Sequence, residues 1–308
     1  MSNNVIGVDI GGTNIRVGLV NEQLQLVRKE TASTGDFQDG EELFRHVKRL
    51  IEKADLYRSA DKVGLALPVP WREGTEILCD ATNIPCLEGI HTDVIKRILT
   101  GYEVHFENDV NVVTFLESEQ GASKAYHQSI YITVSTGIGS GIIVDNKLFH
   151  GAHGYAGEIG SMVISNHGKH HAHASLQPGT LEALCSGRAL ERESKRLYGN
   201  EATVNLLFDK YQRHDEKAER LITDWVEHFS NAIASLMQTI DPDVIVIGGA
   251  VIHNNPWLVD QMIESAKTKV FKHLRDKVHV VLSQFGPDAG IIGAGYMALK
   301  NDKGARTT

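Results

Sequence analysis

The segment Val5–Val20 constrains the fold of this chain more than any other, because two runs of valine and isoleucine flank Gly11-Gly12-Thr13. Such runs on either side of a glycine pair predict two strands joined by a tight turn. Backbone N–H groups at the glycines can approach an anion, and the Thr13 hydroxyl adds a donor. Asp9 ends the first strand here, and a carboxylate near phosphate groups needs a cation such as Mg²⁺ between them. The segment predicts either a nucleotide-phosphate site with magnesium or an ordinary hairpin.

The composition is that of a soluble globular enzyme and argues against nucleic acid or a membrane as partner. The 308 residues suffice for two domains, and 42% of them are hydrophobic. A net charge of −8 lacks the basic excess that binds nucleic acid or anionic lipid. No apolar stretch reaches the roughly 20 residues of a membrane helix, and the start, Met1-Ser-Asn-Asn, has neither a positive charge on its side chains nor a long apolar stretch. Three cysteines, Cys79, Cys86 and Cys185, suit a reducing compartment, so we expect a cytoplasmic protein.

Hydrophobic periodicity predicts an alternation of strands and helices along the whole chain. After the opening hairpin we expect strands at 24–30, 62–68, 102–106, 129–135, 142–148, 243–247 and 278–282. Helices are expected at 41–54, 91–99, 110–121, 181–198, 216–238, 257–270 and 289–299. This order predicts an α/β fold built on open mixed sheets with helices packed on them.

Three further segments follow predicted strands and carry chemistry. Thr136-Gly137-Ile-Gly139-Ser-Gly141 forms a second glycine turn between two strands, where a second domain is expected to begin. Gly248-Gly249 follows an apolar strand and would let a flat ring approach the backbone. Asn108-Asp109 ends one strand and starts a helix, a common place for catalytic side chains in α/β folds. Asp109 is therefore either a general base or a helix N-cap.

Taken together, these segments resemble the actin-like, hexokinase-like ATPase superfamily, and most closely the ROK family of bacterial sugar kinases and repressors. The matching pieces occur in the family order and cover nearly the whole chain: Asp9-Ile-Gly-Gly-Thr13, Asn108-Asp109-Val-Asn111, Ser135-Thr-Gly-Ile-Gly-Ser-Gly141, Gly157-Glu158-Ile-Gly160, Leu181-Glu182 with Ser186-Gly187, and Ile247-Gly-Gly249. The resemblance implies two similar actin-like (ribonuclease H-like) domains with an interdomain cleft. We expect residues 1–118 and 290–308 on the sugar and phosphate side, and residues 119–289 on the nucleotide and dimer side.

The same resemblance implies an ATP- and Mg²⁺-dependent sugar kinase that forms homodimers. Asp109 would accept the proton of the attacking sugar hydroxyl, most often O6. The sugar would be held by Asn83, Asn108, Glu158 and Glu182, although a solvated surface charge is the alternative for the two glutamates. ATP would be bound by Asp9, Gly11, Gly12, Thr13, Thr136, Gly137, Gly139, Gly248 and Gly249, with Asp9 reaching Mg²⁺ through water.

One departure from the family pattern concerns zinc. A histidine and three cysteines that bind structural zinc in the family correspond here to Ser161, His173, Ser175 and Thr180. Serine and threonine are poor zinc ligands, so we expect no structural zinc site. The histidines at 167, 170, 171 and 173 form either a solvated loop or a metal site of another kind.

The substrate implied by the resemblance is an aldohexose such as glucose or allose, phosphorylated at the 6-hydroxyl. N-acetylmannosamine and β-glucosides are alternatives within the family. A non-catalytic ROK-type sugar sensor or regulator is the alternative of another class. Such repressors carry a DNA-binding domain ahead of the first glycine turn, whereas only eight residues precede Asp9 here.

Overall fold

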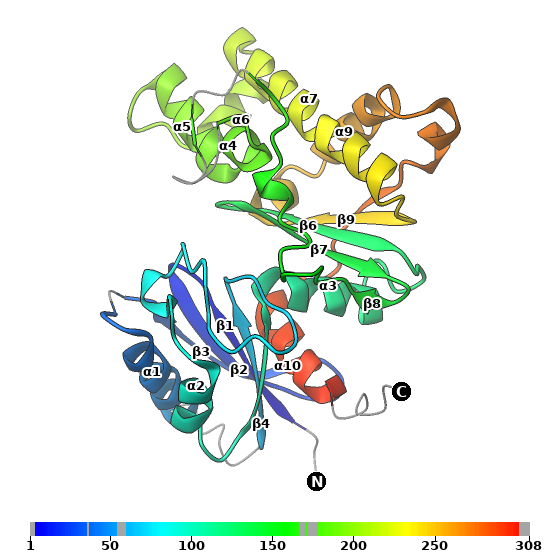
Figure 1. Ribbon diagram of the computed structural model, residues 1–308. Coiled ribbons are helices and arrows are strands. Elements are labelled where there is room, and N and C mark those ends of the chain that lie inside the picture. Colours follow the sequence, from blue (N-terminus) through cyan, green and yellow to red (C-terminus); the bar gives the residue numbers. More distant parts are fainter. Residues whose placement is uncertain (1–3, 36, 54–59, 167–169, 172–177, 302–308) are drawn as a thin grey trace. The chain divides into compact units, whose positions relative to one another are not determined.

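The computed structural model describes residues 4–35, 37–53, 60–166, 170–171 and 178–301 (Figure 1). The chain divides into two compact units. The first contains Met1–Gly121, Lys147–Ala156 and Phe285–Thr308, and the second contains Ala122–Asn146 and Gly157–Gln284. Among the described residues, no helix combines the length and the apolar character that crossing a bilayer requires.

The first sheet has five strands in the order β3-β2-β1-β4-β5. Its strands are β1 (Val5–Ile10), β2 (Asn14–Val20), β3 (Leu26–Ser33), β4 (Lys62–Leu67) and β5 (Glu103–Asn108). The first three strands form an antiparallel meander, as the opening hairpin predicts. β4 then pairs parallel to β1, and β5 pairs parallel to β4, so the sheet is mixed.

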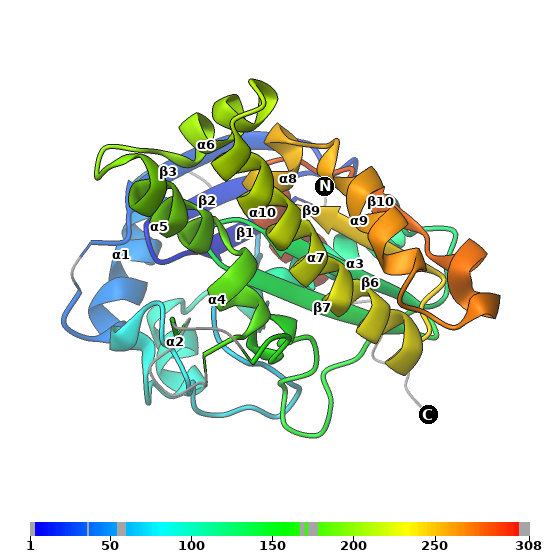
Figure 2. The ribbon, with the colours of Figure 1, turned by 90° about the horizontal axis from the view of Figure 1, so that it is seen from above.

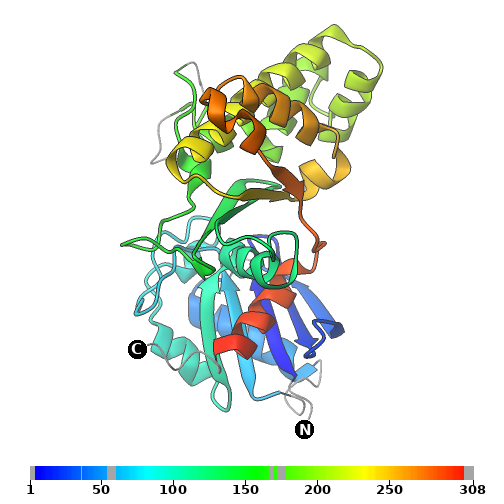
Figure 3. The ribbon, with the colours of Figure 1, turned by 90° about the vertical axis from the view of Figure 1, so that its right-hand side faces the viewer.

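Helices cover both faces of this sheet. They are α1 (Gly40–Lys53), α2 (Thr92–Ile98), α3 (Asp109–Gln120) and α10 (Ala289–Asn301), with a short 3₁₀ turn η2 (Pro85–Leu87). Figure 1 shows α1 and α2 together on one face, where the apolar stripe predicted for α1 is buried: Leu43, Phe44, Val47, Leu50 and Ile51. Figure 3 shows α10, in red, lying against the strands on the other face beside α3.

Glycines in the strands bring α10 unusually close to the sheet. A Cβ atom at Gly7 of β1 would overlap the Ile291 carbonyl oxygen of α10, and one at Gly64 of β4 would overlap that of Ala294. Both strands therefore meet the helix backbone to backbone. This contact fixes α10, the last helix of the chain, onto the two central parallel strands.

The second sheet also has five strands, in the order β10-β9-β6-β7-β8. They are β6 (Ser129–Val134), β7 (Ile138–Val144), β8 (Lys147–Leu148), β9 (Val244–Gly248) and β10 (Val280–Leu282). β6 pairs antiparallel to β7 and parallel to β9, and β10 pairs parallel to β9. The hairpin followed by parallel strands resembles the arrangement of the first sheet.

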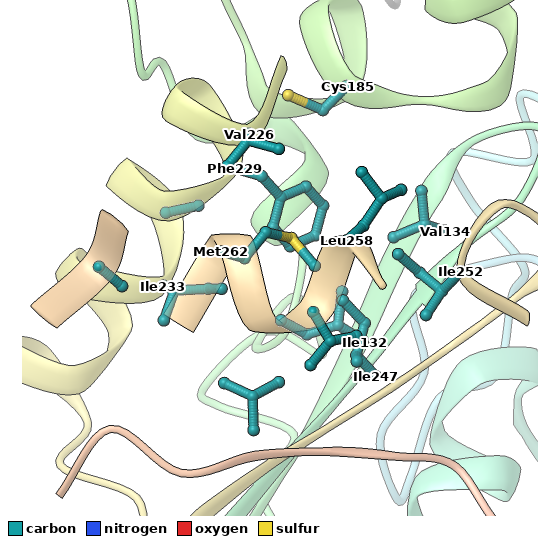
Figure 4. Close-up of a cluster of buried hydrophobic side chains, with 14 of the residues drawn as sticks. Ile132, Val134, Cys185, Val226, Phe229, Ile233, Ile247, Ile252, Leu258 and Met262 are labelled. Carbon is teal, nitrogen blue, oxygen red and sulfur yellow. The ribbon is translucent and has the colours of Figure 1, made fainter. Parts of the chain in front are cut away.

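The helices of the second unit are α4 (Leu181–Cys185), α5 (Gly187–Tyr198), α6 (Val204–Gln212), α7 (Glu216–Thr239), α8 (Ala250–Asn254) and α9 (Leu258–Lys267), with 3₁₀ turns η3 (Ile159–Ser161) and η4 (Lys272–Lys277). In Figure 2, α7 runs over the second sheet with α9 beside it. Their apolar faces meet the strands in one core, where Phe229 of α7 and Met262 of α9 lie near Ile132 of β6 (Figure 4).

Three predicted elements differ from the structure. The strand expected at 142–148 is divided, because Asp145 and Asn146 have positive φ of 50° and 62° between the end of β7 and the start of β8. The helix expected at 181–198 is two helices, because Ser186 adopts an extended backbone and its side chain caps α5 by accepting from the N–H of Ala189. The glycine turn expected at 136–141 is shorter, since Gly139 pairs with Thr133 inside the β6–β7 ladder. The helix α6, capped by Thr203, was not expected from periodicity.

Replacing Gly64 by alanine should destabilise the protein, because the new methyl group meets backbone atoms of α10 that cannot move independently. Overpacking of this kind typically costs about 1–3 kcal/mol of unfolding free energy. Urea unfolding followed by circular dichroism measures the loss. Gly286→Ala is the matched control, since a Cβ there has no heavy atom within 4 Å. Equal unfolding midpoints for the two variants would contradict the close packing of α10.

Candidate active site

The carboxyl ends of β1, β4 and β5 meet at one edge of the first sheet. These strands are parallel neighbours, with Asp9 opposite Ala66 and Leu67 opposite Asn108. The turn that contains Gly11–Thr13 follows β1, and α3 begins directly after β5. Ligands of open α/β sheets bind at such an edge. The topology thus brings Asp9, the first glycine turn and Asn108-Asp109 to the same edge.

The first glycine turn offers unused backbone donors. The N–H of Gly11 donates to the Asn14 carbonyl at 2.9 Å, and Thr34 fixes the turn by donating its hydroxyl to the Gly11 carbonyl at 2.5 Å. Within the described part of the chain, the N–H groups of Gly12 and Thr13 donate to no acceptor, and both residues are exposed. A side chain at Gly12 would begin 3.2 Å from the backbone oxygen of Asn83. The turn can therefore present two N–H groups to an anion beside Asn83.

Asp9 is buried and paired with a cation from its own hairpin. Its carboxylate accepts from the guanidinium of Arg16, which also donates to the Pro287 carbonyl at 2.6 Å. Burial raises the pKa of Asp9, and the charge and hydrogen bond of Arg16 oppose that rise. Among the described residues, the other carboxylate oxygen of Asp9 accepts from no group. Asp9 therefore has one oxygen that can accept a hydrogen bond from a metal-bound water.

Asn108, rather than Asp109, caps α3. Its side-chain oxygen accepts from the N–H groups of Val110 at 2.9 Å and Asn111 at 3.1 Å, and its amide donates to the Val69 carbonyl at 3.1 Å. Asp109 is the first residue of the helix and is half-buried. The capping role that the sequence left open for Asp109 therefore belongs to its neighbour.

A hydrogen-bonded pair of a buried glutamate and a half-buried histidine, which no sequence motif indicates, lies beside this segment. Glu107 is 5% exposed, and its carboxylate lies 2.8 Å from Nε2 of His150. The hydrogen bond to Glu107 raises the pKa of His150, while burial of the ring opposes the rise. Glu107 adjoins a recognisable motif, but nothing in the sequence links it to a histidine 43 residues away.

In the second unit, the carboxyl ends of β6 and β9 also lie side by side. The turn after β6 is held by two helix starts, because Gly187 donates its N–H to the Ser135 carbonyl at 2.8 Å and Ala250 donates to the Ser135 hydroxyl at 3.3 Å. Gly249 follows β9 with φ of +89°, and a Cβ there would overlap the Val134 backbone. Thr136 is exposed at the tip of this turn.

The two glutamates expected to bind sugar lie in different settings within the second unit. One oxygen of Glu182 accepts from the Ile138 N–H at 2.8 Å, and a Cβ at Gly137 would lie 2.6 Å from that oxygen. Glu182 therefore supports the second glycine turn directly. Glu158 is exposed at the N-cap position of η3, after Gly157, which packs on β7.

The positions that correspond to zinc ligands of the family are only partly described. Thr180 caps α4 by accepting from the Ala183 N–H at 3.3 Å, and Ser161 ends η3. His167, His173 and Ser175 lie outside the described residues, and His170 and His171 are exposed. Within the described ranges, no three His, Cys, Asp or Glu side chains gather closely enough to hold a metal ion.

Known proteins share both the sequence and the fold. The chain is 27% identical over 305 residues to the glucokinase of Thermotoga maritima, covering 94% of this chain and 95% of that one. It is 28% identical over 299 residues to the N-acetylmannosamine kinase of Haemophilus influenzae, covering 94% of each.

Solved structures agree with this pattern. The crystal structure of a ROK hexokinase from Thermus thermophilus matches with a TM-score of 0.80 and 30% identity, over 97% of this chain and 99% of that one. A ROK family glucokinase from Streptomyces griseus, in complex with glucose and AMPPNP, matches in fold with a TM-score of 0.82 at 24% identity, over 97% and 100% of the two chains. The sequence model of the ROK family matches residues 5–301, nearly the full length. The chain belongs to the ROK family.

Proposed function

We propose that this protein is an ATP-dependent aldohexose kinase that transfers the γ-phosphate of ATP to the 6-hydroxyl of a hexose such as glucose or allose. The broad class, a sugar kinase, is the one that its named relatives share. The observation that carries the proposal is the placement of Asp109 at the sheet edge where β1, β4 and β5 end.

Asp109 is the general base in this proposal. Phosphoryl transfer needs an oriented hydroxyl, a group that receives its proton and charge neutralisation around the phosphate. Because Asn108 supplies the helix cap, the Asp109 carboxylate is not committed to that structural task. A carboxylate at the first turn of a helix is stabilised as the anion, the form that accepts a proton.

Amide and carboxylate groups hold the sugar in this proposal: Asn83, Asn108, Glu158 and Glu182. Asn108 uses one amide hydrogen on Val69 and keeps the other for a sugar hydroxyl. Glu182 uses one oxygen on Ile138 and can offer the second. Asn83 and Asn108 belong to the first unit, and Glu158 and Glu182 belong to the second.

The ATP phosphates are assigned to the two glycine turns. Gly12 and Thr13 present N–H groups after β1, and Thr136 and Gly137 form the turn after β6. Gly248-Gly249 is assigned to the adenosine. The AMPPNP in the Streptomyces griseus complex supports ATP as the donor, since AMPPNP is an analogue of ATP.

Magnesium is the proposed metal. The remaining oxygen of Asp9 fits a water-mediated contact, and Arg16 neutralises the rest of that carboxylate. When bound, Mg²⁺ supplies charge neutralisation of the transferred phosphate. The protein itself holds Asp9 in place. Arg16 donates to its carboxylate, and that carboxylate occupies the space beside Gly290 that a Cβ atom would fill.

A second substrate class has specific support. Relatives at 26–28% identity are named N-acetylmannosamine, N-acetyl-D-glucosamine and N-acetylgalactosamine kinases. The ROK resemblance also implies, at the position of Ser161, a histidine that contacts the sugar near C1 and C2. An N-acetylhexosamine or a β-glucoside is therefore the alternative substrate, and a non-catalytic sensor is the alternative role. A cytoplasmic homodimer remains part of the proposal.

The experiment that tests this function is ADP release from Mg-ATP across hexoses, N-acetylhexosamines and β-glucosides. Sugar-dependent ADP release, fastest with a hexose, is the expected result, and the ranking of kcat/KM identifies the substrate. Tight sugar binding without ADP release for every compound would contradict the kinase and support the sensor.

Asp109→Asn should lower kcat at least about 100-fold, because a general base typically contributes 10²–10⁴-fold. The circular dichroism spectrum and unfolding midpoint should stay unchanged, since Asn108 remains as the cap. Asp93→Asn is the matched control, an exposed acid in the first turn of α2. Wild-type turnover by the Asp109 variant would rule out this base.

The purified protein should contain zinc far below one ion per chain, because Ser161 and Thr180 replace thiolate and imidazole ligands. A chelator should therefore leave the melting temperature unchanged. Elemental analysis of protein expressed with added zinc provides the measurement. One tightly held zinc per chain would show that other side chains form a structural site.

A further inference from the structure

Buried Glu107 and half-buried His150 form a hydrogen-bonded pair next to the catalytic segment proposed above. One oxygen of Glu107 accepts from the backbone N–H of Asn108 at 2.9 Å and from the side-chain amide of Asn111 at 3.0 Å. The other oxygen lies 2.8 Å from Nε2 of His150. The pair therefore connects the segment around His150 to the start of α3.

As the imidazolium, His150 is a cationic partner of this carboxylate. Without it, Glu107 would keep only two neutral donors among the described residues, Asn108 and Asn111. A buried carboxylate left without its charged partner is strongly destabilised. An imidazolium supplies a charge-assisted hydrogen bond, which is stronger than one from a neutral donor. Glu107 therefore depends on His150 to stay in place.

The first turn of α3 is tied to the same carboxylate. Asn108 accepts from the backbone N–H of Asn111 at 3.1 Å, while Glu107 accepts from both of these asparagines. The three side chains close a hydrogen-bonded ring around the backbone from which Asp109 projects. A shift of Glu107 would loosen this ring and change the placement of Asp109.

His150 is itself held in position by its own segment. The His150 carbonyl accepts from the Ala156 N–H at 3.2 Å. The segment is fixed to the loop after β4, since Gly154 packs against the Trp71 backbone and the Tyr155 hydroxyl donates to Asp80. The imidazole ring of His150 therefore reaches Glu107 from a loop of the same unit that these contacts hold in place.

Resting on the sugar-kinase function above, we propose that His150 is a positioning residue for phosphoryl transfer, which fixes Asp109 by donating to Glu107. The ring does this best as the imidazolium. The reaction should therefore depend on the protonation of a residue that does not contact the transferred phosphate.

The groups that face His150 set the sign of the pH dependence. The hydrogen bond to Glu107 raises the pKa of His150, burial opposes it, and the charges of Glu107 and Glu73 raise it further. Two further charged residues stand at the starts of neighbouring elements, Asp109 at the start of α3 and Lys147 at the start of β8. These two elements pack against each other. The folded-state pKa of His150 thus lies above the unfolded value of about 6.5. The stabilisation of the folded protein by the bond between His150 and Glu107 is therefore complete below about pH 6.5, and it is lost as the pH rises through the folded-state pKa.

Variants of His150 separate the charge from the hydrogen bond. His150→Ala removes the donor and should lower kcat about tenfold to a hundredfold, as small misplacements of reacting groups do. His150→Gln keeps a donor but no titratable ring, so it should retain most of the activity at pH 7 and lack the wild-type decline in kcat as the pH rises through the folded-state pKa of His150. His153→Gln, exposed in the same segment, is the matched control and should keep the wild-type profile.

The effect of His150 on kcat must act through Glu107. In a Glu107→Gln background, His150→Ala should therefore cost little further activity, a non-additivity that a double-mutant cycle measures. Additive losses, or the same pH profile for wild type and His150→Gln, would overturn the positioning role.

A measurement on the sugar-free protein decides the question independently of turnover. With ¹⁵N-labelled asparagine, the Asn108 backbone and Asn111 side-chain resonances should shift with the midpoint of the His150 titration. They should stay constant in His150→Gln. Constant resonances in the wild type would overturn the proposal. If no sugar supports ADP release, the kinase function is wrong. The resonances then still test whether His150 protonation is coupled to Glu107 and the start of α3.

Discussion

The parallel pairing of β1 with β4 and of β4 with β5 is the interaction on which the first unit depends. Strands that run in the same direction end at the same edge, so Asp9 and the first glycine turn lie where β5 brings Asn108 and Asp109. α10 packs on β1 and β4 so closely that only glycine fits where they touch. The strands that position the candidate site are therefore also the strands that the last helix fixes.

Partly or fully buried carboxylates support the candidate residues within each unit. Asp9 is held by an arginine of its own hairpin, Glu107 by His150, and Glu182 by a backbone N–H of the second glycine turn. In each case the carboxylate has a partner, as burial requires. The candidate base, Asp109, is kept apart from helix capping because Asn108 performs it. The structural role thus belongs to Asn108, and the proposed chemical role belongs to the adjacent Asp109.

The sequence was sufficient where local chemistry decides the structure. The periodicity of α1 identified its buried face, and the glycine pair after Ile10 identified the hairpin and its turn. It was insufficient where distant residues decide: Gly139 joins β7 because Thr133 pairs with it, and His150 meets Glu107 only through the fold. Ser186 divides the predicted helix at 181–198 by a capping bond that periodicity does not register.

We propose above that Asp109 activates the 6-hydroxyl of a hexose. The position of the phosphate in the product tests this transfer, and it can be read from ¹H–³¹P correlation spectra of the sugar formed with Mg-ATP. Transfer to the 6-hydroxyl predicts coupling of phosphorus to the two protons at C6 and no free phosphate beyond the background. Coupling to the proton at C1, or release of inorganic phosphate without a sugar phosphate, would contradict it.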